Sequence, residues 1–501
     1  MKRKYYLTVV IAMAAICGIS LFLWFSQHRP QSEAHIPGAN KLQRVLTIRG
    51  RDYHARIIRQ AAAAMQADWE KRNMPYEFYA EIEYYGLGSL FDDNTRFQTG
   101  LMAGVAQDIF MFDPFLHCFH ALINSGFLQD IYPLIDACPT TGRDSFYANA
   151  LDAFAINGGL YILPTSFGIN YVGVNVNLPE EFLSRFTQKY TVTLREMIEF
   201  YLDLKHYHGN EFGHFKIIAG CGHMTHHNRV LQTFFNDYVD FNTRTADLMN
   251  PGFMELLELL GRLGPQQFPY TLNWLIGGED LQEWEQSFIF HTVGRGLGPF
   301  TALFEPVAPS FIHYIPLVDE QGRLLIDTPG EQGQVWSGIC ISTRADGALA
   351  WEFTTHLIYA FANPIPPHSI SNYVAGYHFG VQSLASSILR STFRESTMLN
   401  LANGFDEWGR RAWRRGINYG PVVSRHFPLF VGFDRRVTRE EQFEAAINRI
   451  AAYNEYPMAM IRSMIPHRLF GDHLDQFLRG KINAETAAQR MQNAISLWLI
   501  E

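Results

Sequence analysis

Beyond residue 41, the chain alternates between the hydrophobic periods of strands and helices, and this pattern constrains the fold more than any other feature. Apolar positions predict strands over residues 42–48, 80–85 and 108–111. A helix between the first two strands carries its apolar face at Ile58, Ala61, Met65 and Trp69. A second helix over residues 94–102 is ended by Gly104. This order of elements predicts an α/β fold with a mostly parallel sheet.

Capping patterns mark where later helices begin. Thr193 and Glu196 have the spacing of a capping box, and Asn250 followed by Pro251 fits an N-cap and the first helical position. The last helix is predicted to start near Asn483. Its apolar stripe consists of Ala487, Met491, Ile495 and Trp498.

The amino end predicts a signal or membrane anchor over residues 1–25. Lys2, Arg3 and Lys4 precede an uncharged run over residues 5–25, which as a helix spans roughly 30 Å, the thickness of a bilayer core. Basic residues keep their side in the cytoplasm, so the rest of the chain is expected outside it. An uncleaved anchor fits best, while signal cleavage and lipidation at Cys17 remain open. Residues 26–41 then form a tether.

Charge and cysteine content exclude two classes of protein. Lys and Arg total 41 against 49 Asp and Glu, a formal net charge of −8, which argues against nucleic-acid binding. The exported part holds Cys118, Cys138, Cys221 and Cys340 without a CxxC pair, which is no disulfide scaffold. Buried free thiols are expected, and a bridge between Cys118 and Cys138 stays an alternative.

Six motif-like segments occur in order along the chain, including Gly104-Val-Ala-Gln-Asp108-Ile109, residues 157–165 and Ala350-Trp351-Glu352-Phe353. They resemble segments of the extracellular solute-binding proteins of ABC importers, the class that includes maltose- and oligosaccharide-binding proteins. The most specific is Asn-Gly-Gly-Leu-Tyr-Ile-Leu-Pro-Thr at 157–165, which is similar to Asp-Gly-Lys-Leu-Tyr-Gly-Leu-Pro in the family. Gln107 departs from the family's usual Pro in its turn. The other similar segments are 104–109, 125–131, 193–197, 342–353 and 480–488.

The resemblance implies a two-lobed periplasmic-binding-protein-like α/β fold with a hinge and an interlobe cleft. Lobe 1 is expected over residues 42–165 plus 317–360. Lobe 2 is expected over residues 166–316 plus 361–501. The chain would cross between the lobes at Pro164 and Thr165 and again at Pro316, and proline would restrict the backbone at both hinge segments.

The resemblance also assigns ligand-binding positions. Aromatic rings cover the faces of a sugar, whereas carboxylates, amides and arginines bind its hydroxyls. The expected ligand-binding residues are Arg51, Asp52, Phe112, Asp113, Phe167, Asn170, Tyr171 and Trp336. The positions after Phe112 that are polar in family members read Phe115-Leu116, which weakens a specific oligosaccharide assignment.

Each of these residues also has a purely structural interpretation. Phe112 and Phe167 are of a type that more often lies in a core. Arg51 and Asp52 could pair with each other or cap the next helix. Asp113 could serve simply as the first residue of a proline turn.

Residues 206–227 contain six histidines and Cys221, and imidazole and thiolate groups are the usual ligands of zinc. Their spacing matches no closed zinc motif, and structural or surface histidines are the better interpretation. The sequence therefore predicts no cofactor, no metal and no enzymatic activity.

The predicted function is binding of a solute, by the resemblance a sugar or oligosaccharide, and its delivery by hinge closure to ABC permease subunits. The protein is expected to be a monomer at the outer face of the cytoplasmic membrane, held there by its N-terminal segment. Two alternatives remain: an anchored co-receptor for a membrane sensor, and a metal-dependent envelope enzyme.

Overall fold

The computed structural model describes residues 42–362, 386–395 and 444–500. Within them it omits 52–53, 86–96, 98, 113–118, 176, 188, 213–215, 220–225, 264–287, 294–310, 327–337, 445–446, 449–450 and 461–464. The predicted anchor and tether, residues 1–41, lie outside the described residues. In the described part, no helix has both the length and the apolar character needed to span a bilayer.

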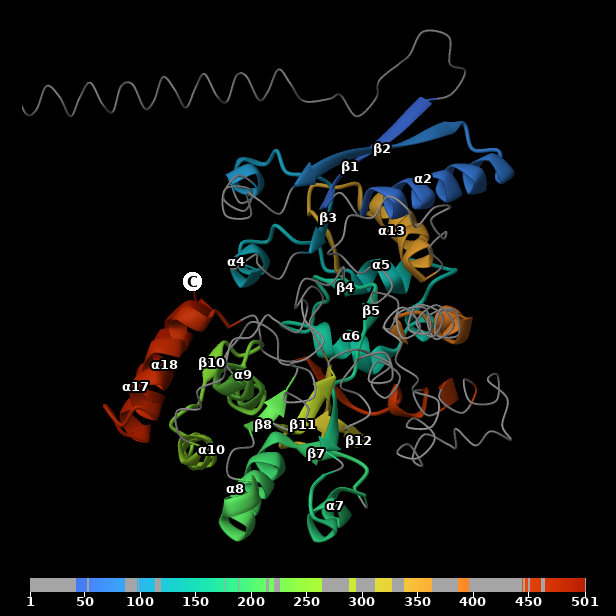
Figure 1. The fold of residues 1–501 in the computed structure, drawn as a ribbon. Coiled ribbons are helices and arrows are strands. Elements are labelled where there is room, and N and C mark those ends of the chain that lie inside the picture. Colours follow the sequence, from blue (N-terminus) through green and yellow to red (C-terminus); the bar gives the residue numbers. More distant parts are fainter. Residues whose placement is uncertain are drawn as a thin grey trace, which may run out of the picture. The chain divides into compact units, whose positions relative to one another are not determined.

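The described residues divide into two compact units (Figure 1). Unit 1 contains the chain up to Met111 and Ile341–Ala360, and unit 2 contains Phe112–Cys340 and the chain from Phe361 on. Helices and strands alternate in both, which confirms the α/β class. The lobe boundaries given by the resemblance stay a prediction.

Unit 1 contains the parallel sheet predicted from the sequence. Strand β1 (Leu42–Arg51) lies between β2 (Tyr76–Tyr85) and β3 (Ile109–Phe112), and both neighbours run parallel to it. Pairing between β1 and β2 continues over their whole length, from Leu42 opposite Tyr76 to Arg51 opposite Tyr85. All three predicted strands are therefore confirmed: β1 and β2 are longer than their apolar patterns, and β3 is shifted by one residue at the same length.

Helices α2 (His54–Lys71) and α13 (Gly347–Ala362) pack together in unit 1. The stripe predicted for α2 is buried along its whole length, from Ile58 to Trp69. The Trp69 indole donates a hydrogen bond to Glu352 Oε1 of α13 at 2.9 Å, and Phe78 of β2 stacks on Phe353 at 5.2 Å. Apolar burial and one shared polar contact thus fix both helices.

Gly104 ends the helix before β3, as predicted. Its φ of +72° lies in the left-handed region, which costs glycine little. The amide of Gly104 donates to Leu101 O at 3.0 Å, and the amide of Val105 donates to Gly100 O at 2.8 Å. These two bonds satisfy carbonyl groups at the helix end and turn the chain toward β3.

Unit 2 is built around a mixed sheet in the order β16-β13-β12-β6-β11-β8. Strand β6 is central and antiparallel to both neighbours, β12 and β11, while β8 runs parallel to β11. Along this path lie β6 (Tyr171–Asn175), β8 (Lys216–Ala219), β11 (Phe288–Val293), β12 (Phe311–Val318), β13 (Leu324–Ile326) and β16 (Met458–Met460), and β7 (Val192–Thr193) pairs with β12 beside it.

Shorter strands and several helices complete unit 2. The short strands are β4 (Leu163–Pro164), β5 (Ser166–Phe167), β7 (Val192–Thr193), β9 (Val239–Asp240), β10 (Thr245–Ala246), β14 (Gly338–Ile341) and β15 (Ser386–Ser387). The α-helices are α4 (Phe119–Asn124), α5 (Tyr132–Ala137), α6 (Ala148–Phe154), α7 (Glu180–Thr187), α8 (Leu194–Phe212), α9 (His226–Tyr238), α10 (Pro251–Arg262), α17 (Gly471–Leu478) and α18 (Ala484–Ile500). The 3-10 helices are η2 (Arg143–Ser145) and η8 (His467–Leu469).

The predicted cap of α10 and the predicted start of α18 near Asn483 are confirmed. The Asn250 side chain accepts a hydrogen bond from the Gly252 amide at 2.9 Å, and Pro251 is the first residue of α10. Asn483 accepts from the Thr486 amide at 2.8 Å at the start of α18. The α18 stripe is buried at all four predicted positions.

The capping box of α8 forms with both of its hydrogen bonds. The Glu196 amide donates to Thr193 Oγ1 at 3.1 Å, and the Thr193 amide donates to Glu196 Oε2 at 2.9 Å. We expect Thr193→Ala to lower the free energy of unfolding by about 0.5–2 kcal/mol, because one helix-start amide loses its acceptor. Urea unfolding of the full chain measures this loss. Thr193→Ser keeps the hydroxyl group and should retain most of the stability, and equal losses in both variants would contradict the cap's contribution.

Candidate ligand-binding site

The carboxyl edge of the unit 1 sheet is the first part of the candidate site. Strands β1 and β3 are neighbours although β2 lies between them in the chain, so the chain changes direction across the sheet there. In open α/β sheets, ligands bind at the carboxyl ends of strands beside such a switch point. Arg51 is the last residue of β1, and Phe112 is the last residue of β3. Each of these two predicted positions is therefore the residue at the carboxyl end of its strand.

Three other predicted ligand-binding residues, Asp52, Asp113 and Trp336, lie outside the described residues. Their assignments stay predictions.

Arg49, two residues before the end of β1, carries a buried charge that the sequence analysis did not single out. Arg49 is 7 % exposed, and its guanidinium group lies 3.5 Å from Glu83 Oε1 and over the ring of Phe97 at 4.8 Å. Gln107 donates a hydrogen bond to the same Glu83 carboxylate. The sequence signal that could have indicated Arg49 is a basic residue two positions before Arg51 in a half-buried strand. The ion pair between Arg49 and Glu83 therefore holds two charged groups close to the carboxyl ends of the strands.

The two predicted hinge segments have well-defined partners in unit 2. Pro164 pairs with Gly338 of β14, and Thr165 is buried. Pro316 of β12 lies opposite Tyr171 of β6. The structure therefore places the second predicted hinge segment directly beside residues that follow the first.

Asn170 connects three strands at this point. Its carbonyl oxygen accepts from the Leu317 amide at 2.8 Å, and its backbone amide donates to Leu325 O at 2.9 Å. Its side-chain nitrogen donates to the same Leu325 carbonyl at 3.2 Å. Asn170 is 2 % exposed, so its amide group serves the strand network within unit 2.

Phe167 and Tyr171 are also buried within unit 2. Phe167 is 0 % exposed and meets the Tyr147 ring edge-on at 5.7 Å. Tyr171 is 1 % exposed and lies 6.2 Å from the Tyr453 ring. These side chains are held in the core of unit 2, and their roles toward a ligand stay predictions.

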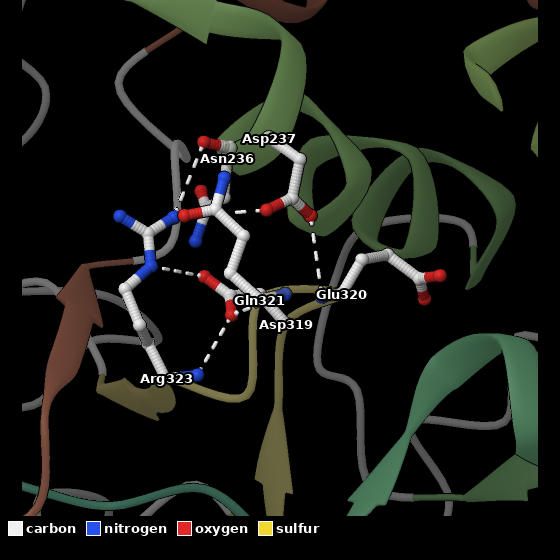
Figure 2. A network of polar contacts seen from close by, with 6 residues as sticks. All are labelled: Asn236, Asp237, Asp319, Glu320, Gln321 and Arg323. Atoms are coloured by element: carbon white, nitrogen blue, oxygen red, sulfur yellow. Dashed lines mark hydrogen bonds and ion pairs between the residues drawn. The ribbon is translucent and has the colours of Figure 1, made fainter. Parts of the chain in front are cut away.

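A polar network secures the turn between β12 and β13, the two strands that hold Asn170 (Figure 2). Asp319 Oδ1 accepts from the amides of Gln321 and Arg323 at 3.1 and 2.8 Å, and Asp319 Oδ2 accepts from Arg323 Nε at 2.7 Å. Arg323 also donates to the carbonyl oxygen of Asn236 in α9 at 3.5 Å. The hairpin that carries Pro316 is thus attached at its turn to α9.

Among the residues that the structure describes, no group of three or more His, Cys, Asp and Glu side chains could hold a metal ion. His208 contacts Glu181 at 2.8 Å, and His206 packs against Tyr207. His214, Cys221 and His223 lie outside the described residues.

The described cysteines are Cys138, which is half-buried, and Cys340, which is buried. Burial raises the pKa of the Cys340 thiol well above its ordinary value, which makes this thiol unreactive. Cys118 lies outside the described residues, so its predicted alternative pairing with Cys138 stays a prediction.

No family model and no curated protein matches the chain in sequence. Solved structures do match it over nearly its whole length. The sugar-binding protein MalE from Xanthomonas citri superposes with a TM-score of 0.54 at 13 % identity, covering 91 % of this chain and 97 % of that protein.

Two further structures agree. A putative oligosaccharide periplasmic-binding protein from Synechococcus sp. has a TM-score of 0.51 at 10 % identity, covering 91 % of this chain and 99 % of its own. A periplasmic oligogalacturonide-binding protein from Yersinia enterocolitica has a TM-score of 0.51 at 11 % identity with the same coverage. The chain therefore has the fold of the extracellular sugar- and oligosaccharide-binding proteins, the class that its sequence resembles.

Proposed function

We propose that this protein binds a sugar or oligosaccharide outside the cytoplasm and delivers it to the permease of an ABC importer. The observation that supports the proposal is the switch point between strands β1 and β3, whose carboxyl-terminal residues are Arg51 and Phe112. Structures that share the fold are described as binding sugars, oligosaccharides and an oligogalacturonide, which supports this class of ligand.

The proposed mechanism involves no covalent chemistry. Sugar binding favours a closed arrangement of two lobes over an open one, and the chain segments around Pro164 and Pro316 act as the hinge. The closed form then docks on the permease subunits. A membrane tether formed by the N-terminal segment keeps the protein at the outer face of the cytoplasmic membrane, where it acts as a monomer.

Phe112 provides the test of this function. We expect the full-length protein to bind a maltooligosaccharide or an oligogalacturonide in isothermal titration calorimetry. We expect Phe112→Ala to weaken that binding about tenfold or more, equivalent to about 1.4 kcal/mol, because the sugar loses an aromatic contact at the strand end. Absence of binding across a panel of neutral and acidic sugars would contradict the proposed ligand class.

Tyr79→Ala is the matched control. Tyr79 is also an aromatic residue of the unit 1 sheet, but it lies in the middle of β2 and is 58 % exposed. Its replacement should leave the affinity unchanged. Equal losses in the two variants would mean that the carboxyl edge has no special role in binding.

A further inference from the structure

Two carboxyl groups are buried where the β12–β13 turn meets helix α9 (Figure 2). The side chain of Asp319 is fully buried, and the side chain of Asp237, at the end of α9, is only 6 % exposed. Arg323 lies between them and is the cation that contacts both, with Nε 2.7 Å from Asp319 Oδ2 and Nη2 3.7 Å from Asp237 Oδ1. Two buried carboxylates beside one guanidinium group leave an excess negative charge, which burial disfavours.

The hydrogen bonds distinguish the two acids. Asp319 accepts three, one from Gln321 and two from Arg323, and the charge-assisted one is short. Asp237 accepts one long bond, from the Glu320 amide to Oδ2 at 3.3 Å. Its Oδ1 is buried and has no hydrogen-bond partner among the described residues. Asp237 is therefore the acid that gains most from binding a proton.

We propose that Asp237 is a protonation switch for the β12–β13 hairpin, which is held firmly to α9 when this carboxyl group carries a proton and loosens when the proton leaves. Loss of the proton places a second negative charge beside Asp319, and both then compete for Arg323. The Arg323 contact to the carbonyl of Asn236 also links the turn to α9, and it is also long.

The surrounding charges support a switch in the acidic to neutral range. Burial, and after it the charge of Asp319, raises the pKa of Asp237 to about 6 from an ordinary value of 3.8, although the Glu320 amide and Arg323 act in the opposite direction. Glu320 raises the pKa slightly and is itself paired with Arg195 of α8 at 2.8 Å. Tyr238 is the remaining titratable neighbour on α9.

The hairpin is also the element that carries Pro316 and holds Asn170 from both of its strands. A loosely attached hairpin makes the predicted hinge segment around Pro316 less stiff. Protonation of Asp237 therefore regulates the hinge. The effect on the hinge rests on the proposed function, whereas the protonation of Asp237 and the attachment of the hairpin to α9 do not.

Hydrogen exchange of the full-length protein tests the switch without any ligand. We expect opening of the Leu317 and Arg323 amides, corrected for the intrinsic pH dependence of exchange, to increase more than about tenfold between pH 4.5 and 7.5. The Ala487 amide, which donates to Asn483 O at the start of α18, serves as the internal reference. Its opening should not change with pH. A flat profile at Leu317 and Arg323 would overturn the proposal.

Asp237→Asn removes the titrating group at nearly constant shape. In this variant the opening of the hairpin should no longer depend on pH, while the exposed Asp203→Asn variant, which loses the ion pair with Arg185, should behave like the parent protein. Unchanged pH dependence in Asp237→Asn would assign the effect to another group and refute the switch. Sugar binding without hairpin opening would leave the proposed function intact, and hairpin opening without sugar binding would leave the switch intact.

Discussion

Replacing Trp69 with Ala is expected to lower the free energy of unfolding by about 3–5 kcal/mol, the cost of removing a large aromatic side chain from a core. Trp69 is 2 % exposed, and its ring meets the edges of Tyr76 at 6.1 Å and Phe78 at 5.7 Å. It also links α2 to α13 through Glu352. Urea unfolding followed by the fluorescence of the remaining tryptophans measures the loss, which we expect in the transition of unit 1.

Trp69→Phe keeps part of the ring contacts and loses the hydrogen bond. It keeps an aromatic ring against Tyr76 and Phe78 but removes the indole N–H together with the five-membered part of the ring system, while Glu352 still has Arg72 as a partner. We expect a loss of about 1–2 kcal/mol for this variant. If Trp69→Phe and Trp69→Ala lowered the free energy of unfolding equally, ring packing would not be what holds α2 to the sheet.

Replacing Asp319 with Ala is expected to cost about 3–5 kcal/mol, because it leaves the guanidinium group of Arg323 without its closest partner. Two backbone amides of the turn lose their acceptor in the same variant. The loss should appear as a lower urea midpoint for unit 2 and as faster exchange of the amides in β12 and β13.

Asp319→Asn is the matched variant, since it keeps an oxygen for the turn amides but loses the charge beside Arg323. We expect an intermediate loss. A second comparison uses Glu320→Gln, which alters the partly exposed pair with Arg195 and should cost about 1 kcal/mol or less. If Asp319→Ala proved no more costly than Glu320→Gln, the buried carboxylate would contribute no more than a surface ion pair.

Sequence periodicity was sufficient to predict unit 1 and the helix caps. The strands and α2 follow from apolar spacing within short windows, and the caps at Thr193 and Asn250 follow from side chains that bond within a few residues. Such local interactions depend on neighbours in the chain, so the sequence displays them directly.

Contacts between distant segments could not be predicted in this way. Asp237 and Asp319 lie on separate elements, and nothing in either local pattern indicates that they share Arg323. Phe167 and Asn170 were assigned by their position after a predicted crossing, but their burial depends on β12, β13 and Tyr147, which come from elsewhere in the chain. Position along a strand is readable from sequence, whereas the surroundings of a side chain depend on tertiary packing.

The central place of β6 has a consequence for how the chain reaches its native state. Val172 pairs with Thr292 on one side and with Ile315 on the other, so neither partner exists until much of the chain has been synthesised. Pairings between segments so far apart in sequence form slowly, because loop closure must precede them. In unit 1 the Ser342 amide bonds to Asp108 O, which again joins an early segment to a late one. A growing chain therefore remains open until its later strands emerge, and the period in which a chaperone or a translocation pore could engage it is correspondingly long.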